Sequence, residues 1–225
     1  MESFRKMLLC SLALVSPFTL AEQLAQEEQK YVDRYVTAVN SKNLSALKSL
    51  SHPSYLNCIS DENQDFFDSL FQKDLERNIP PDYKVSFSKL TVDNAKTERE
   101  GASKIGLPYP VLPTHDMQID FAKSEYSFVT IHRKLILESG EFYQVGGCPE
   151  VHILERYRVM QKRRKEDLLT AKKLLGELTE EQRSRFTILL TEGKRIEAWK
   201  GYSKEANISI GMAKLVLEQL IETND

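Results

Sequence analysis

The sequence predicts an α+β fold, in which N-terminal helices pack on a curved antiparallel sheet and a helical extension follows. Three observations lead to this prediction. Residues 22–75 carry apolar side chains at helical spacing. Residues 115–148 alternate between apolar and polar side chains and turn at Ser139-Gly140, the pattern of a β-hairpin. Residues 155–221 return to helical spacing.

The first 21 residues are predicted to be a signal peptide. Arg5 and Lys6 precede an apolar run over residues 7–15, and Ala21 supplies a small residue at the cleavage site. This run is shorter than the roughly 20 residues that a membrane-spanning helix needs. We therefore expect a secreted or periplasmic protein with no stable membrane span after signal removal.

Two cysteines remain after the predicted cleavage, Cys58 and Cys148. In an exported protein an even pair of cysteines indicates one disulfide, and two buried free thiols are the alternative. The sequence has no CxxC motif, so neither a thiol redox motif nor a cysteine zinc site is supported.

Residues 22–153 are expected to form the α+β domain. Helices are predicted over 22–39, over 43–50 and over 61–75, with Asp61 as the N-cap of the third. A first strand is predicted over 83–92. The segment 93–114 is polar and then rich in proline, so we expect a loop or an irregular edge strand there.

The hairpin assigns side chains to the two faces of the sheet. With Ser139-Gly140 as the turn, Leu137 lies opposite Phe142, and Ile131 lies opposite Cys148. The helices are expected to cover the more apolar face, and a close backbone approach or a bulge is expected at Gly146-Gly147. The apolar face contains Val129, Ile131, Leu135, Leu137, Phe142 and Cys148. The other face contains Tyr126, Phe128, Thr130, His132, Lys134, Ile136 and Tyr143.

Residues 154–225 are expected to form the helical extension. Its first helix, over 155–175, contains the basic run Lys162-Arg163-Arg164-Lys165, which indicates a solvated helix face, with binding to an anionic surface as the alternative. Thr179 and Gln182 form a capping-box pattern at the start of a second helix. A final amphipathic helix is predicted over 212–221.

The N-terminal half resembles the nuclear transport factor 2-like cone fold, which includes ketosteroid isomerases and SnoaL-like cyclases. The resemblance covers roughly residues 25–153 and rests on the segments 32–40, 41–47 and 52–55. It implies that Tyr35 is the pocket tyrosine that hydrogen-bonds a developing oxyanion. The position of the isomerases' carboxylate base falls near Cys58, so this chain lacks the expected base there, and Asp120 lies on the wrong face by alternation. The pocket residues that we expect from this fold are Tyr35, Tyr55, Phe121, Ile131 and Phe142.

Residues 186–222 resemble the helical part of the C-terminal domain of the ribosomal stalk protein. The motif runs from Leu190 to Tyr202 and resumes from Ala213 to Glu218. Trp199 replaces an isoleucine of the family pattern, and the family's strands have no counterpart. The resemblance implies a helix–turn–helix hairpin that packs on the cone or docks a partner.

The composition of the chain and the absence of certain motifs exclude several classes of function. The net charge of −2 argues against a nucleic-acid partner. No histidine has a second ligand at helical spacing, and nucleotide and nucleophile motifs are absent, so we expect no metal and no cofactor. We expect a non-catalytic binding or interaction protein that holds a small apolar ligand or has its interior filled by its own side chains. It would bind a protein partner, or a second copy, through the sheet face or the C-terminal helices. The alternative is an isomerase- or cyclase-like enzyme that uses Tyr35.

Overall fold

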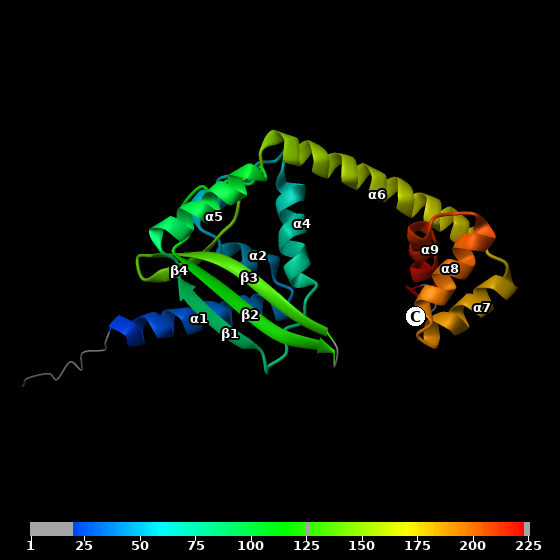
Figure 1. Ribbon diagram of the computed structural model, residues 1–225, viewed down its shortest axis with the longest axis horizontal. Coiled ribbons are helices and arrows are strands. Elements are labelled where there is room, and N and C mark those ends of the chain that lie inside the picture. The colour runs from blue at the N-terminus through cyan, green and yellow to red at the C-terminus, as the bar shows by residue number, and fades with distance from the viewer. Residues whose placement is uncertain (1–19, 125–126, 223–225) are drawn as a thin grey trace, which may run out of the picture. The chain divides into compact units, whose positions relative to one another are not determined.

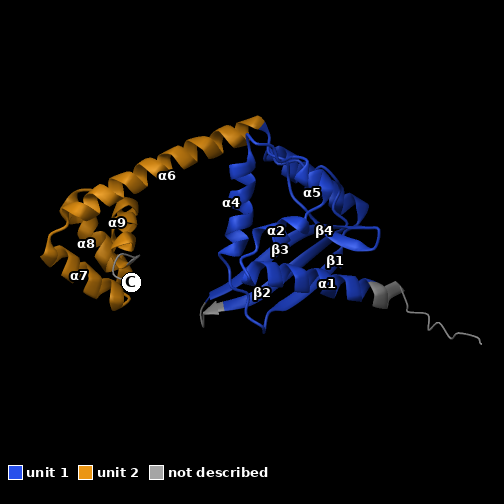
Figure 2. Ribbon diagram, turned by 180° about the vertical axis from the view of Figure 1, so that it is seen from behind, with its two compact units in different colours: residues 1–150 blue, residues 151–225 orange. Residues whose placement is uncertain are grey.

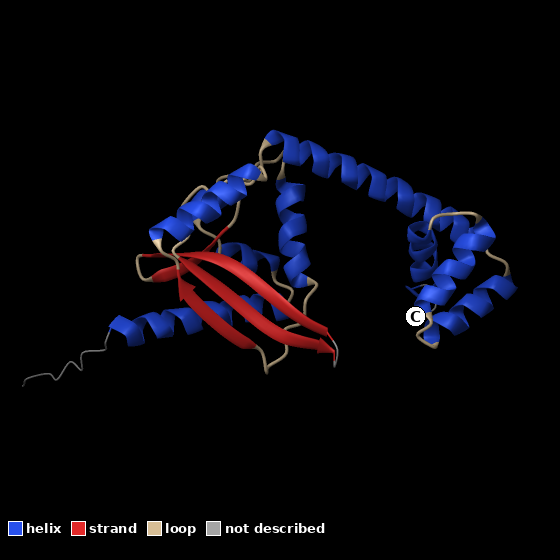
Figure 3. Cartoon of the chain, viewed as in Figure 1, coloured by secondary structure: helices blue, strands red, loops and turns tan. Residues whose placement is uncertain are grey.

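The computed structural model describes residues 20–124 and 127–222, and these form two compact units, residues 1–150 and 151–225 (Figure 2). The described residues combine helices with one antiparallel sheet, which confirms the predicted α+β class (Figure 3). The predicted signal peptide lies outside the described residues except for its last two positions, where the first helix already begins.

The elements of unit 1 follow the predicted order of helices before sheet (Figure 1). They are α1 (Leu20–Asn40), α2 (Leu44–Ser49), α3 (Pro53–Leu56), α4 (Gln64–Leu75), β1 (Lys84–Lys89), α5 (Val92–Lys104), β2 (His115–Ser124), β3 (Ser127–Glu138) and β4 (Glu141–Val145). The elements of unit 2 are α6 (Val151–Glu177), α7 (Glu180–Thr191), α8 (Arg195–Ala206) and α9 (Ile210–Glu222).

The sheet is a four-stranded antiparallel meander in the order β1-β2-β3-β4. Ser139 and Gly140 both have positive φ, 52° and 82°, as a two-residue hairpin turn of type I′ requires. Leu137 pairs with Phe142, so the predicted register is confirmed. The predicted pairing of Ile131 with Cys148 is wrong, because β4 ends at Val145 and the backbone N–H of Cys148 bonds to Pro108 instead.

Helices α1 and α2 lie on one side of the sheet (Figures 1 and 2). From the sheet, Met117, Ile119, Ile131, Leu135 and Phe142 are buried, as the alternation predicts. The helices contribute Tyr31, Val32, Tyr35, Val39, Phe67 and Phe71, all of them buried. These residues form the core of unit 1.

Two predictions for unit 1 are wrong in detail. The segment 93–114 begins with the helix α5, whose N-cap Thr91 accepts a hydrogen bond from Asn94 N. Its buried positions are only Ala95 and Ala102, so the helix carries little apolar signal, and the prolines follow it. Helix α4 begins at Gln64 with Asn63 at the cap position, so Asp61 is not the N-cap.

Unit 2 packs its four helices around a core of its own. Thr179 and Gln182 form the predicted capping box at the start of α7. Asn207 ends α8 in the left-handed conformation, with φ of 52°. The buried core contains Ala171, Leu175, Leu178, Phe186, Leu190, Ala198, Tyr202, Ala213, Val216, Leu217 and Leu220. Among residues 20–124 and 127–222, no helix is both long enough and apolar enough to cross a membrane.

Candidate functional site

The five residues predicted to line a pocket are all buried inside unit 1. Tyr35 on α1 is 0% exposed and Tyr55 on α3 is 3% exposed. Phe121, Ile131 and Phe142, one from each of β2, β3 and β4, are equally enclosed. The ring of Tyr31 packs on both Tyr35 and Phe142, with ring centroids 6.5 Å apart in each pair. That these five residues hold a ligand stays a prediction.

A buried charged cluster lies at the centre of this interior, and the sequence reasoning missed two of its three members. Arg133 on β3 donates a hydrogen bond to Tyr35 Oη at 2.9 Å and forms an ion pair with Asp74 Oδ2 of α4. The side chain of Arg133 is 15% exposed and that of Asp74 is 8% exposed. Arg77 Nη1 lies 3.4 Å from the other carboxylate oxygen of Asp74. The only carboxylate among the buried described residues is therefore neutralised by two arginines.

The sequence contains a signal for both missed residues. Arg133 lies between Ile131 and Leu135, so strand alternation places it on the apolar face that the helices cover. Asp74 follows Phe67 and Phe71 at positions i+7 and i+3, so helical spacing places it on the buried stripe of α4. Two opposite charges, each predicted on a buried face, indicate a buried ion pair.

The environment of the cluster keeps its tyrosine neutral. Burial raises the pKa of Tyr35 to about 12, although the nearby Arg133 charge acts in the opposite direction. Burial alone would lower the pKa of Arg133, but Tyr35 and Asp74 outweigh that effect and the pKa is raised. The cluster at neutral pH is thus a neutral tyrosine beside a closed ion pair.

Three buried polar atoms in this region have no hydrogen-bond partner within the part of the chain that the structure describes. Two of them are Tyr31 Oη and Arg133 Nε, and the third is Arg77 Nη1. The charge of Arg133 also acts on the Tyr31 hydroxyl, which places the two groups within electrostatic reach of each other. A buried water or a small polar group next to any one of these atoms would satisfy it.

Asp120, the other carboxylate weighed as a base, lies on the opposite face of the sheet, as alternation predicts. It accepts hydrogen bonds from Thr130 Oγ1 and Gln118 Nε2, each at 2.6 Å. These bonds, that from Thr130 first, lower the pKa of Asp120, so it is a solvated, ionised group. It cannot serve as a base inside unit 1.

Cys58 and Cys148 form a disulfide, with Cα atoms 5.6 Å apart, as predicted. The bond joins the segment after α3 to the segment after β4. Gly146 lies in close contact with Tyr55, because a Cβ atom at this position would be 2.3 Å from the Tyr55 Cζ atom. The predicted close backbone approach is therefore confirmed at Gly146.

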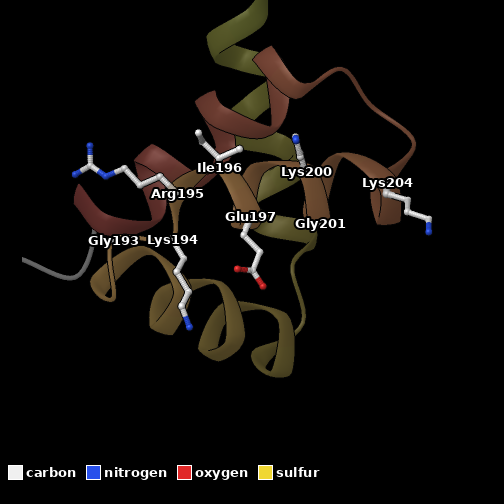
Figure 4. Close-up of a pocket in the computed structure, with 8 residues that line it drawn as sticks. All are labelled: Gly193, Lys194, Arg195, Ile196, Glu197, Lys200, Gly201 and Lys204. Carbon is white, nitrogen blue, oxygen red and sulfur yellow. The ribbon is translucent and has the colours of Figure 1, made fainter.

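Unit 2 presents an open hollow of about 700 Å³ along one side of α8 (Figure 4). The residues that line the hollow are Gly193, Lys194, Arg195, Ile196, Glu197, Lys200, Gly201 and Lys204. We call these eight residues the α8 face. It carries four cations and one carboxylate, and Ile196 is 64% exposed.

The charges of the α8 face are mostly without an intramolecular counterpart. Lys194 pairs with Glu192 at 2.9 Å, but no ion pair joins Arg195, Lys200 or Lys204 to a carboxylate within residues 20–124 and 127–222. Gly201, in the middle of the helix, is one of the residues that line the hollow. An exposed apolar side chain and unpaired cations on one helix are suited to an acidic partner with an apolar anchor.

No family model, no curated protein and no solved structure matches this chain. The resemblances to the cone fold and to the ribosomal stalk protein both stay predictions. Among the described residues, no group of three or more His, Cys, Asp or Glu side chains is arranged to hold a metal ion.

Proposed function

We propose that this chain is an exported, non-catalytic interaction protein, in which unit 1 is a scaffold and the α8 face of unit 2 binds a protein partner. The observation that carries the proposal is the α8 face itself, an open hollow whose lining includes the exposed Ile196 and three cations without an ion pair in the described part of the chain. The chemistry of this face fits a partner segment that carries acidic side chains on either side of an apolar one.

The interior of unit 1 supports the scaffold role. Its buried carboxylate, Asp74, already pairs with Arg133 and Arg77, and the hydroxyl of Tyr35 already accepts a bond from Arg133. A general base must be free to accept a proton from a substrate, and an ion pair with two arginines opposes that. The disulfide adds a covalent link to the same unit.

The proposal is tested by titrating the isotope-labelled protein with a synthetic peptide that has glutamates flanking a single leucine. Amide shifts in the NMR spectrum should be confined to residues 193–204, and raising the salt concentration should weaken binding. Lys200→Gln combined with Lys204→Gln should lower the affinity by roughly two- to fivefold per lysine. The matched control, Lys172→Gln with Lys173→Gln on α6, should bind as the unaltered protein does. Shifts spread over both units, or equal losses in the two variants, would contradict the proposal.

A small apolar ligand inside unit 1 is the second candidate function. The unpaired atoms Tyr31 Oη and Arg133 Nε favour it, because a ligand with one polar end would satisfy them while its apolar part meets the surrounding rings. Mass spectrometry of small molecules released from purified protein tests this. A stoichiometric compound that is lost in the Tyr31→Phe variant supports it, whereas release of no compound refutes it.

An isomerase or cyclase that acts through Tyr35 is the alternative with the least support. It needs an interior carboxylate free to take a proton, and Asp74 is held by its arginines. Turnover of a β,γ-unsaturated ketone that is lost on Tyr35→Phe would support the enzymatic alternative. We expect no turnover above that of buffer.

A further inference from the structure

We propose that residues 156–165 of α6 dock the protein on an anionic membrane surface. This stretch, which we call the basic segment, has six cations and no carboxylate. The cations are Arg156, Arg158, Lys162, Arg163, Arg164 and Lys165. The inference is independent of the α8 face, which lies on another helix of the same unit.

The basic segment lies outside the core of its unit. From α6, that core contains Ala171 and Leu175, with Leu174 packed against it, and all three belong to the C-terminal part of the helix. Within the basic segment every side chain is exposed except those of Tyr157 and Gln161, which are half-buried. A solvated helix face would have this exposure too, so the exposed apolar residues decide between the two interpretations.

Two apolar side chains are exposed in the middle of the basic segment. Val159 is 52% exposed and Met160 is 62% exposed. With Arg156 and Arg163 they occupy positions i, i+3, i+4 and i+7, so the four side chains share one face of the helix. On this face two arginines flank two adjacent apolar side chains.

A lipid surface can bind both the cations and the apolar side chains of this helix face. The head groups of anionic lipids attract the cations, and the boundary between head groups and acyl chains accepts the apolar side chains. The phosphate backbone of a nucleic acid would attract the cations but would leave Val159 and Met160 in water. The charge of the basic segment is also local, because the whole chain has a net charge of −2. The nearest carboxylates, Glu155, Glu166 and Asp167, flank the segment and lie outside it.

Co-sedimentation of residues 22–225, the chain after the predicted cleavage, with lipid vesicles tests the proposal. One kind of vesicle contains phosphatidylcholine alone, and the other contains phosphatidylcholine with added phosphatidylglycerol. We expect binding only to vesicles that contain phosphatidylglycerol, and release at high salt. Arg156→Gln combined with Arg163→Gln should weaken binding about fivefold per cation. Val159→Ser combined with Met160→Ser should also weaken it, whereas the control Lys172→Gln with Lys173→Gln should weaken it less. Helix content from circular dichroism should be the same in all three variants.

Three results would overturn the proposal: no binding at low salt, equal binding to both kinds of vesicle, or tighter binding to a DNA duplex than to the anionic vesicles. The two proposals also fail separately. Lys200→Gln with Lys204→Gln should leave vesicle binding unchanged, and the arginine variants of the basic segment should leave binding of the acidic peptide unchanged.

Discussion

Removing either partner of the buried ion pair between Asp74 and Arg133 should destabilise unit 1. Removing Asp74 should cost more stability than removing Arg133. Replacing Asp74 by Leu leaves the guanidinium of Arg133 with two neutral partners, the hydroxyl of Tyr35 and the backbone carbonyl of His132, and with no carboxylate in direct contact. An arginine cannot shed its charge, so this change should cost about 3–5 kcal/mol. Replacing Arg133 by Met leaves Asp74 with Arg77 at 3.4 Å, and a carboxylate can also take up a proton. Arg133→Met should therefore lower the free energy of unfolding by less than Asp74→Leu does.

The double variant separates the value of the pair from the cost of leaving one charge alone. Arg133→Met combined with Asp74→Leu removes both charges and fills their space with apolar groups, so it should be more stable than Asp74→Leu alone. Urea unfolding followed by the near-ultraviolet circular dichroism of the tyrosines measures all three variants. Losses below about 1 kcal/mol in both single variants, or a double variant as unstable as the sum of the two, would refute the reasoning.

Three further predictions concern unit 1. Removing the disulfide by Cys58→Ala and Cys148→Ala should lower the free energy of unfolding by about 2–4 kcal/mol, because the bond closes a long loop; thiol labelling of both cysteines in the unreduced protein would show that the bond is not formed. Gly146→Ala should destabilise by about 1–3 kcal/mol through its clash with a buried ring, whereas Gly101→Ala, with open space around it on a helix, should stabilise by about 0.5–1 kcal/mol in the same thermal unfolding assay. The pKa of Tyr35 is raised from 10.0 to about 12, so its share of the stability should be intact below pH 10 and lost as the pH rises towards 12; loss of stability above pH 10 that is as steep in Tyr35→Phe would contradict this.

The sequence predicts the layout of unit 1 well where side-chain patterns are strong. The hairpin is the clearest case, because alternation and a two-residue turn together determine the pairing of Leu137 with Phe142. The same reasoning fails beyond Val145, where a pair of glycines ends the strand and the extrapolated partner of Ile131 does not exist. Helix α5 was missed because alanines form its buried side, and alanine contributes little to an apolar pattern.

The sequence contains a signal for each member of the interior cluster. Tyr35 was identified through a family resemblance, whereas Arg133 and Asp74 follow from periodicity alone once each is assigned to a face. That the two charges meet each other depends on how α4 crosses the sheet, which no local pattern specifies. The α8 face is a similar case, since the sequence shows its cations but not the hollow that they line.

Photo-cross-linking in cells that produce this protein tests the central claim, that the functional surface is the α8 face, most directly. A photoreactive phenylalanine analogue replaces Ile196, which is 64% exposed, or, as the matched control, Val92 on α5, which is 66% exposed. We expect a discrete cross-linked partner from position 196 that is absent from position 92 and is lost on Lys200→Gln with Lys204→Gln. Equal cross-linking from both positions, or a partner that survives the lysine changes, would contradict it.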